Sequence, residues 1–202
     1  LPTLTEHYHV SRAAMGLAVN ASTAGMAVSG LATALMSRRI RRREGVATCL
    51  GLLAIPTALL ALAPDLATFA MLRVVQGILM AAAFTLTLAY LGEECSASQA
   101  AGAFAAYITG NVASNLLGRL LAAAFAGRFG LDANFYVFAG LNLAGAVLAY
   151  RALGSMRMMM ADHPSGTSLS ALGRHLAAPD LRWGFAIGFS ILFVFIGIFT
   201  YV

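Results

Sequence analysis

Ser37-Arg38-Arg39-Ile40-Arg41-Arg42-Arg43-Glu44-Gly45 lies between two long apolar runs and holds five of the thirteen arginines of a chain without lysine. Moving an arginine into hydrocarbon costs a few kcal/mol, so these side chains are expected at the membrane surface. Because positively charged residues gather in cytoplasmic loops, the loop is predicted to face the cytoplasm. That assignment fixes the sidedness of every apolar run before and after it.

The composition is that of an integral membrane protein. Of the 202 residues, 60% are hydrophobic and only 10% are charged, whereas soluble domains average about 25% charged residues. The net charge of +5 could suggest a nucleic-acid partner, but the arginines stand at the ends of apolar runs. We therefore interpret the charge as a topology signal and predict no nucleic-acid binding. Cys49 and Cys95 fall in or beside apolar runs and are interpreted as packing residues.

The apolar runs predict an all-α membrane protein, a helical bundle of transmembrane helices. A membrane-spanning helix needs about 20 mainly apolar residues. Spans are expected over residues 12–36, 46–63, 66–91, 100–126 and 135–150, and a sixth run starts at Trp183. Ser11 is the expected N-cap of the first span, whose polar positions facing the interior are expected to be Asn20 and Thr23.

The polar stretches between the runs alternate between the two sides of the membrane. Residues 1–10, the Pro64-Asp65 turn and a turn from Arg128 to Asn134 are expected outside, and residues 151–182 inside. His7 and His9 could bind a metal, but histidines two apart on a short loop are usually solvated. No metal site and no cofactor are predicted.

These assignments divide the chain into three parts. Residues 1–153 are predicted to be a transmembrane bundle lacking its first helix, 154–182 a cytoplasmic linker, and 183–202 the partial first helix of a second bundle. The chain begins at Leu1 rather than at methionine and stops inside an apolar run. We expect it to be a piece of a longer protein.

Three stretches of the sequence resemble signatures of the major facilitator superfamily. Residues 34–43 resemble the loop pattern G-x-L-A/S-D-R-x-G-R-K/R between helices 2 and 3, with Arg39, Arg42 and Arg43 matching. Arg38 stands where the family has an aspartate that helps to latch the inner gate. Either the latch is weakened here, or another acid such as Glu44 replaces it.

Leu72-Arg73-Val74-Val75-Gln76-Gly77 fits the helix 4 signature R-x-x-Q-G, the most specific match in the chain. Glu93 and Glu94 stand where the family commonly has an acid at the end of helix 4. Residues 110–119 read G-N-x-x-x-N-x-x-G-R, which is similar to the arabinose-efflux-like branch of drug exporters.

The resemblance implies a fold and a function. The chain would comprise helices 2–6 and the start of helix 7 of a secondary transporter, working as a monomer in the lipid bilayer of a bacterial inner membrane. It would export small organic molecules in exchange for protons by alternating access. The resemblance also assigns the gate to Arg39, Arg42, Arg43 and Glu93.

The fourth span carries two rows of residues four apart. Gly110, Ser114 and Gly118 form a row of small residues suited to close helix contact. A second row, about 100° round the helix, is polar. It consists of Tyr107, Asn111, Asn115 and Arg119. Because a polar row cannot face lipid cheaply, it is expected to face a cavity or neighbouring helices.

Arg73 stands about seven residues from the outer end of its span. At about 1.5 Å per residue, it is expected about 10 Å below the outer surface. An isolated charge at that depth is expensive, so it needs a partner. Backbone carbonyls, a substrate anion and an acid on another helix all remain open, as does a purely structural role. With Gln76, Arg73 is a candidate for the substrate or proton pathway, together with Asn111, Asn115 and Arg119.

A rival hypothesis is a truncated, non-transporting membrane protein that acts as a scaffold or partner. About six further spans after Val202 in the reading frame would favour the transporter. An enzyme is not predicted, because no Ser/His/Asp group, metal cluster or phosphate-binding loop converges at membrane depth.

Overall fold

The computed structural model describes residues 2–36, 40–153, 182–183, 186–190 and 193–194. It forms two units, Leu1–Met158 and Met159–Val202. The first unit contains α1 (Pro2–Tyr8), α2 (Arg12–Met36), α3 (Arg42–Leu59), a 3-10 turn η2 (Leu60–Leu62), α4 (Leu66–Glu94) and α5 (Ala97–Ala152). No strand occurs among the described residues, so the predicted all-α class is confirmed.

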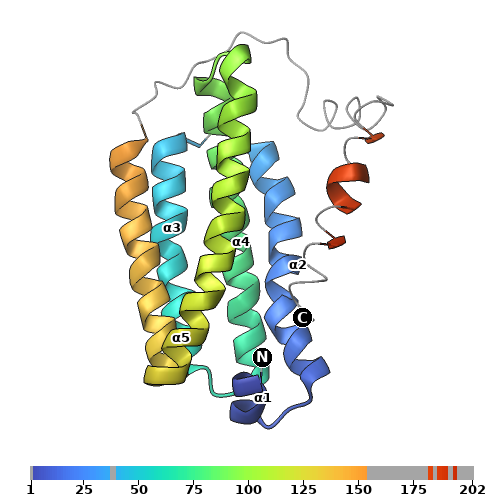
Figure 1. Cartoon of the computed structure of the whole chain (residues 1–202), viewed down its shortest axis with the longest axis vertical. Helices are drawn as coiled ribbons and strands as arrows, with labels where there is room; N and C mark the ends of the chain where they lie inside the picture. Colours follow the sequence, from blue (N-terminus) through green and yellow to red (C-terminus); the bar gives the residue numbers. More distant parts are fainter. Residues whose placement is uncertain (1, 37–39, 154–181, 184–185, 191–192, 195–202) are drawn as a thin grey trace. The chain divides into compact units, whose positions relative to one another are not determined.

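The helices of the first unit run up and down in a bundle. In Figure 1, α1, the connection between α3 and α4, and the bend of α5 lie at the lower end, while α2 and α4 finish at the upper end. The start of α3, with Arg42, and the end of α4, with Glu93, therefore lie at the same end of the bundle. This is the alternation that the charge pattern predicts.

α5 contains the fourth and fifth predicted spans in one helix that bends back on itself. Gly130 has φ +84° and ψ 172°, a backbone conformation that side chains with a Cβ rarely adopt. The chain reverses there, and the two arms of α5 run in opposite directions (Figure 1). The turn predicted over seven residues, 128–134, is wrong in extent, because one glycine makes the reversal and both flanks stay helical.

The stretch before the first span also differs from the prediction. Pro2–Tyr8 form the short helix α1 rather than a loop, and α1 is followed by His9 with a left-handed φ of 52°. The Tyr8 hydroxyl donates to the Ala63 carbonyl at 3.0 Å, and the Tyr8 ring meets Phe69 edge-on at 5.6 Å. α1 is held by these contacts at the end of the bundle, where Met15 and Leu60 are also buried.

Two helix starts follow from capping side chains. The Ser11 hydroxyl accepts the Ala14 N–H at 3.2 Å, as predicted. The Asp65 carboxylate accepts the Thr68 N–H at 2.7 Å at the start of α4. This bond stabilises the charged carboxylate and lowers the pKa of Asp65 below the ordinary value.

α2 and α4 approach each other closely because small residues line their contact. A Cβ added to Gly77 would overlap the Ser22 carbonyl oxygen, and one added to Gly25 would overlap the Val74 carbonyl oxygen. The Ser29 hydroxyl donates across the contact to the Ile78 carbonyl at 2.7 Å. Small residues let membrane helices approach where no hydrophobic drive acts between them.

The polar positions that α2 turns inward are not the predicted ones. Thr23 is exposed and Asn20 is only half-buried, whereas Ser22, Ser29 and Thr33 are buried. Hydrophilicity alone does not show which face of an almost wholly apolar helix packs against its neighbour within this unit.

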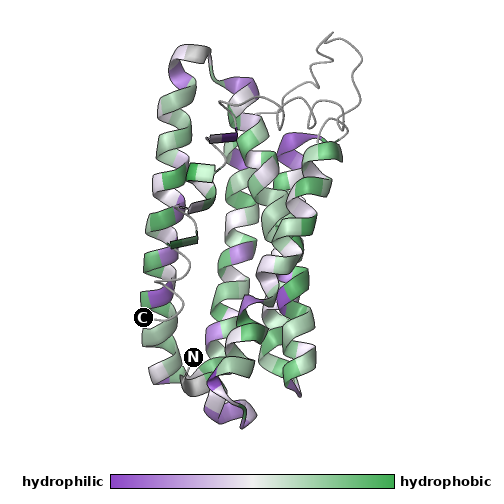
Figure 2. Ribbon diagram, turned by 90° about the vertical axis from the view of Figure 1, so that its right-hand side faces the viewer, coloured by the Kyte–Doolittle hydropathy of each residue, from purple (hydrophilic) through white to green (hydrophobic). Residues whose placement is uncertain are grey.

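The described residues contain four helices long and apolar enough to cross a membrane. The longest, Ser98–Ala152, has 55 residues and is bent at Gly130. Each of its two arms is long enough for one crossing, which needs about 20 residues. Figure 2 shows apolar residues over most of the helical surface, with hydrophilic residues at the helix ends and in a few bands along the helices. Large exposed side chains such as Leu17, Val28 and Leu148 suit contact with lipid.

In the second unit the described residues are helical pieces at 182–183, 186–190 and 193–194. The rings of Phe189 and Phe193 stack at 5.9 Å, and Trp183 is exposed. The predicted linker, 154–182, lies outside the described residues except for Arg182. The division into bundle, linker and partial second bundle therefore remains a prediction.

Candidate functional site

Arg73 lies inside the first unit with three neutral partners. Its Nε donates to the Val19 carbonyl at 3.1 Å, its Nη1 to Gln76 Oε1 at 2.8 Å and its Nη2 to Ser22 Oγ at 3.3 Å. No carboxylate lies within 4 Å of this guanidinium in the part of the chain that the structure describes. The sequence left several kinds of partner open. The structure shows a backbone carbonyl and two polar side chains in contact with Arg73.

Gln76 extends this contact into the bundle. It is 5% exposed, and while its carbonyl oxygen accepts from Arg73, its Nε2 donates to Thr57 Oγ1 at 2.8 Å. Asn142 Nδ2 donates to the same hydroxyl at 3.1 Å. We call the five residues Ser22, Arg73, Gln76, Thr57 and Asn142 the polar network.

The polar network joins four helices. Ser22 comes from α2, Thr57 from α3, Arg73 and Gln76 from α4, and Asn142 from the second arm of α5. Because every partner is neutral, the network surrounds one positive charge with oriented dipoles. Such an arrangement keeps a guanidinium at membrane depth without an acid.

The sequence predicted only two members of the polar network. Arg73 and Gln76 were expected and are in direct contact. Ser22, Thr57 and Asn142 were not predicted. A polar residue inside an apolar run is a signal for a buried polar contact, and this signal could have identified Thr57 and Asn142. Thr57 also follows Pro56, where the helix loses one backbone N–H and polar side chains are often close.

The structure does not bring the predicted row of the fourth span into the polar network. Asn111, Asn115 and Arg119 lie on the first arm of α5 and are exposed within this chain. Arg119 Nε donates to Asn115 Oδ1 at 3.1 Å, a bond along the helix. Tyr107, one turn before Asn111, is half-buried against Phe84 at 5.3 Å between ring centres.

The small-residue row on the same arm also behaves differently from the prediction. No atom lies within 4 Å of a Cβ added to Gly110, and one added to Gly118 would only touch Phe138, at 3.9 Å. Gly25 and Gly77, in the contact of α2 with α4, make the close approach instead. Spacing in sequence shows that glycines share a face but not which helix covers it.

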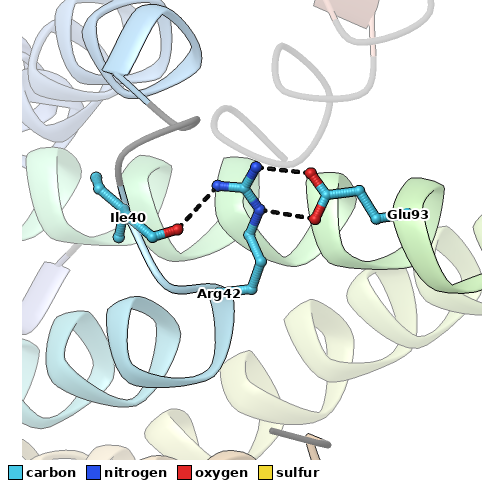
Figure 3. A network of polar contacts seen from close by, with 3 residues as sticks. All are labelled: Ile40, Arg42 and Glu93. Carbon is cyan, nitrogen blue, oxygen red and sulfur yellow. Dashed lines mark hydrogen bonds and ion pairs between the residues drawn. The ribbon is translucent and has the colours of Figure 1, made fainter. Parts of the chain in front are cut away.

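Two arginines at the start of α3 tie the ends of two other helices. Arg42 Nε donates to Glu93 Oε2 at 3.1 Å and Nη2 to Oε1 at 2.6 Å, and Nη1 donates to the Ile40 carbonyl at 3.1 Å (Figure 3). Arg43 Nε donates to the Tyr150 carbonyl at 2.6 Å, and its guanidinium lies 4.0 Å from the centre of the Tyr150 ring.

The acid that reaches an arginine from another helix is therefore Glu93. Glu44, which the sequence offered as a substitute for the missing aspartate, pairs with Arg41 of its own loop at 2.7 Å. Both of those side chains are more than half exposed, whereas that of Arg42 is 11% exposed. Arg39 lies outside the described residues.

The two cysteines are free and half-buried. Cys49 borders a cleft of about 470 Å³ at the ends of α2, α3 and α4, next to Gly45, Thr48 and Leu86. Among the residues that the structure describes, no group of three histidine, cysteine or acidic side chains could hold a metal ion.

Comparison with known proteins identifies the family. The model of the Major Facilitator Superfamily matches residues 1–202. The chain belongs to this superfamily. The contacts of Arg73 with Gln76 and of Arg42 with Glu93 join residues at which the sequence resembles signatures of this superfamily. The chain is an integral membrane protein by its family and by its apolar helices.

Curated relatives of the superfamily are similar at low identity. An uncharacterized transporter of Buchnera aphidicola subsp. Schizaphis graminum is 25% identical over 203 residues, which cover 100% of this chain and 49% of that protein. The uncharacterized MFS-type transporter YybF of Bacillus subtilis is 26% identical over 206 residues, 98% of this chain and 49% of that protein.

The inner membrane transport protein YnfM of Escherichia coli is 26% identical over 203 residues, covering 100% of this chain and 49% of that protein. The chain thus spans about half the length of these relatives. No solved structure matches it significantly.

Proposed function

We propose that the gene product containing this chain is a secondary transporter that exports small organic molecules in exchange for protons by alternating access. The proposal places it in the arabinose-efflux-like branch, as a monomer in a bacterial inner membrane. The names of the relatives support transport, and the name of the Escherichia coli relative supports the inner membrane. The observation that carries the proposal is the half-buried Arg73, whose described hydrogen-bond partners are all neutral.

A guanidinium in this setting can act without changing its own protonation. Arginine stays charged at working pH, so Arg73 would act through its field on a neighbouring acid, on water or on an anionic group of the substrate. None of its described partners carries a negative charge that would cancel this field. In a medium of low dielectric, the field favours the anionic form of an acid that comes close.

The exposed row on α5 fits a part in the same pathway. Asn111, Asn115 and Arg119 stand at mid-helix on the first arm, where lipid would be an unfavourable neighbour. We therefore propose that they line the water-filled passage between the two halves of the transporter. In alternating access, two bundles rock about a central site, and the pair of Arg42 and Glu93 would close the cytoplasmic side.

Transport in inverted membrane vesicles that contain the complete gene product tests the proposal. Proton release from the vesicle lumen would be followed by a pH-sensitive dye while a panel of small organic cations, anions and neutral compounds is added. We expect at least one compound to dissipate the gradient, and Arg73→Ala and Asn115→Ala to abolish or strongly reduce the response. If both variants respond as the wild type does, the assignment of the site is wrong. A wild type inert to the whole panel would favour the scaffold hypothesis.

A further inference from the structure

We infer that Thr57 and Asn142 are positioning residues, which hold Gln76 and through it Arg73 in one orientation for transport. The inference rests on the proposed function for its purpose and on the geometry of the polar network for its physical content. Neither residue belongs to the motifs that the sequence shows, and neither touches Arg73. They act through the amide of Gln76.

The Thr57 hydroxyl is a saturated junction. It donates to the Leu53 carbonyl at 2.7 Å and accepts from Gln76 at 2.8 Å and from Asn142 at 3.1 Å. A hydroxyl has one hydrogen and two lone pairs, so this set uses its full capacity. The donor of the hydroxyl is directed along its own helix, which leaves both lone pairs to the two amides.

This junction decides which way the Gln76 amide faces. With its NH2 group on Thr57, the amide presents its carbonyl oxygen to Arg73 Nη1. A flipped amide would place its NH2 group against a guanidinium, two donors face to face. It would also leave one of the two lone pairs of the Thr57 hydroxyl without a donor. Because Thr57 and Gln76 are each only 5% exposed, water would not easily replace the lost bonds.

Asn142 adds the link to the second arm of α5. Its bond to Thr57 connects residues 85 apart in sequence. Thr57 and Gln76 thus link the second arm of α5 to the Arg73 guanidinium. The same guanidinium is bonded to Val19 and Ser22 of α2. The orientation of Arg73 thus depends on three helices other than its own.

The competing explanation is that these bonds only stabilise the bundle. The two explanations differ in what happens to the guanidinium of Arg73. A positioning role predicts that removing the Thr57 hydroxyl loosens Arg73 in a protein that stays folded. A merely structural role predicts lower stability with an unchanged guanidinium.

The first measurement follows the Arg73 Nε–H by NMR in the complete gene product, labelled with ¹⁵N-arginine in detergent micelles. Loss of one signal in Arg73→Lys assigns the resonance. The Nε–H donates to Val19, so it exchanges with water only when the guanidinium leaves its place. We expect Thr57→Val to speed this exchange about fivefold, the factor that corresponds to one lost neutral hydrogen bond, and Thr57→Ser to restore the wild-type rate. Asn142→Leu should act in the same direction.

The matched control is Thr33→Val, the same change at a buried threonine of α2 that is not part of the polar network. It should leave the exchange rate of Arg73 unchanged. Equal rates in the wild type, Thr57→Val and Asn142→Leu would overturn the inference, and so would a faster exchange in Thr33→Val of the same size as in Thr57→Val.

The second measurement is transport in the vesicle assay. Thr57→Val should lower the rate about fivefold in the wild-type background and add no further loss to Gln76→Leu, which already breaks the link. Equal losses in both backgrounds would refute action through Gln76. If the wild-type vesicles show no proton-linked transport but Thr57→Val still exchanges faster, the proposed function is rejected. The positioning of Arg73 by Thr57 would then still stand.

Discussion

Gly77→Ala probes the contact on which the site depends. Gly77 is the last residue of the helix 4 motif, and a Cβ at this position would overlap the carbonyl oxygen and two further backbone atoms of Ser22 on α2. A backbone cannot swing aside as a long side chain can, so α2 would have to move away from α4. The same Ser22 accepts a hydrogen bond from Arg73.

The size of the effect follows from two opposing terms. Overpacking a filled contact costs about 1–3 kcal/mol, and a backbone neighbour places this case at the upper end. Replacing glycine by alanine inside a helix returns about 1 kcal/mol in propensity. The net expectation is therefore a loss of about 2 kcal/mol in the free energy of unfolding.

Gly30→Ala is the matched control, because it lies on the partner helix α2 and no atom stands within 4 Å of the added Cβ. It should be neutral or stabilising by up to about 1 kcal/mol. Unfolding of the complete gene product in increasing mole fractions of SDS, followed by circular dichroism, measures both. If Gly77→Ala unfolds at the same mole fraction as Gly30→Ala, the close contact of α2 with α4 is not as described.

Two further predictions concern the ends of the helices. In a double-mutant cycle with alanine, Arg42 and Glu93 should couple by about 1 kcal/mol in the free energy of unfolding, since their bond is bidentate and Arg42 is largely buried. The exposed pair Arg41 and Glu44 should couple by less than about 0.5 kcal/mol. Equal coupling in the two cycles would contradict this expectation. The lowered pKa of Asp65 means that its capping bond stabilises the fold above the pKa of an unfolded aspartate, about 4, and that this contribution is lost as the pH falls through the lower folded value. Asp65→Asn keeps a capping oxygen and should flatten the acid limb of a stability profile measured between about pH 5 and pH 3, whereas an unchanged limb would assign the acid sensitivity to other groups.

Much of the fold could be predicted from the sequence because its signals are local. The span expected over 12–36 is α2, Arg12–Met36, and the span expected over 66–91 is α4, Leu66–Glu94. Apolar length, an N-cap serine and a Pro-Asp turn are all properties of a few consecutive residues. They set where a membrane helix starts and ends before any neighbour is known.

The candidate site was predictable only in part, because its geometry depends on which faces meet. Arg73 and Gln76 are three residues apart on one helix, so their contact follows from helical spacing alone. Thr57 is 19 residues from Gln76, and Asn142 is 85 from Thr57. No pattern within one helix indicates that these side chains meet, and the same limit led to the choice of Asn20 and Thr23 over Ser22.

The glycines of the helix contact and the half-buried charge of Arg73 belong to one arrangement. Ser22 is the residue that a Cβ on Gly77 would strike and also an acceptor for Arg73, and Val19, one turn earlier on α2, supplies the carbonyl. Because small residues bring the two backbones together, a main-chain oxygen comes within hydrogen-bond distance of the guanidinium. Close packing of helices thus does here what an acidic side chain would otherwise do. It also leaves the positive charge of Arg73 without a described counter-ion, so the charge remains able to act on whatever anion comes near it.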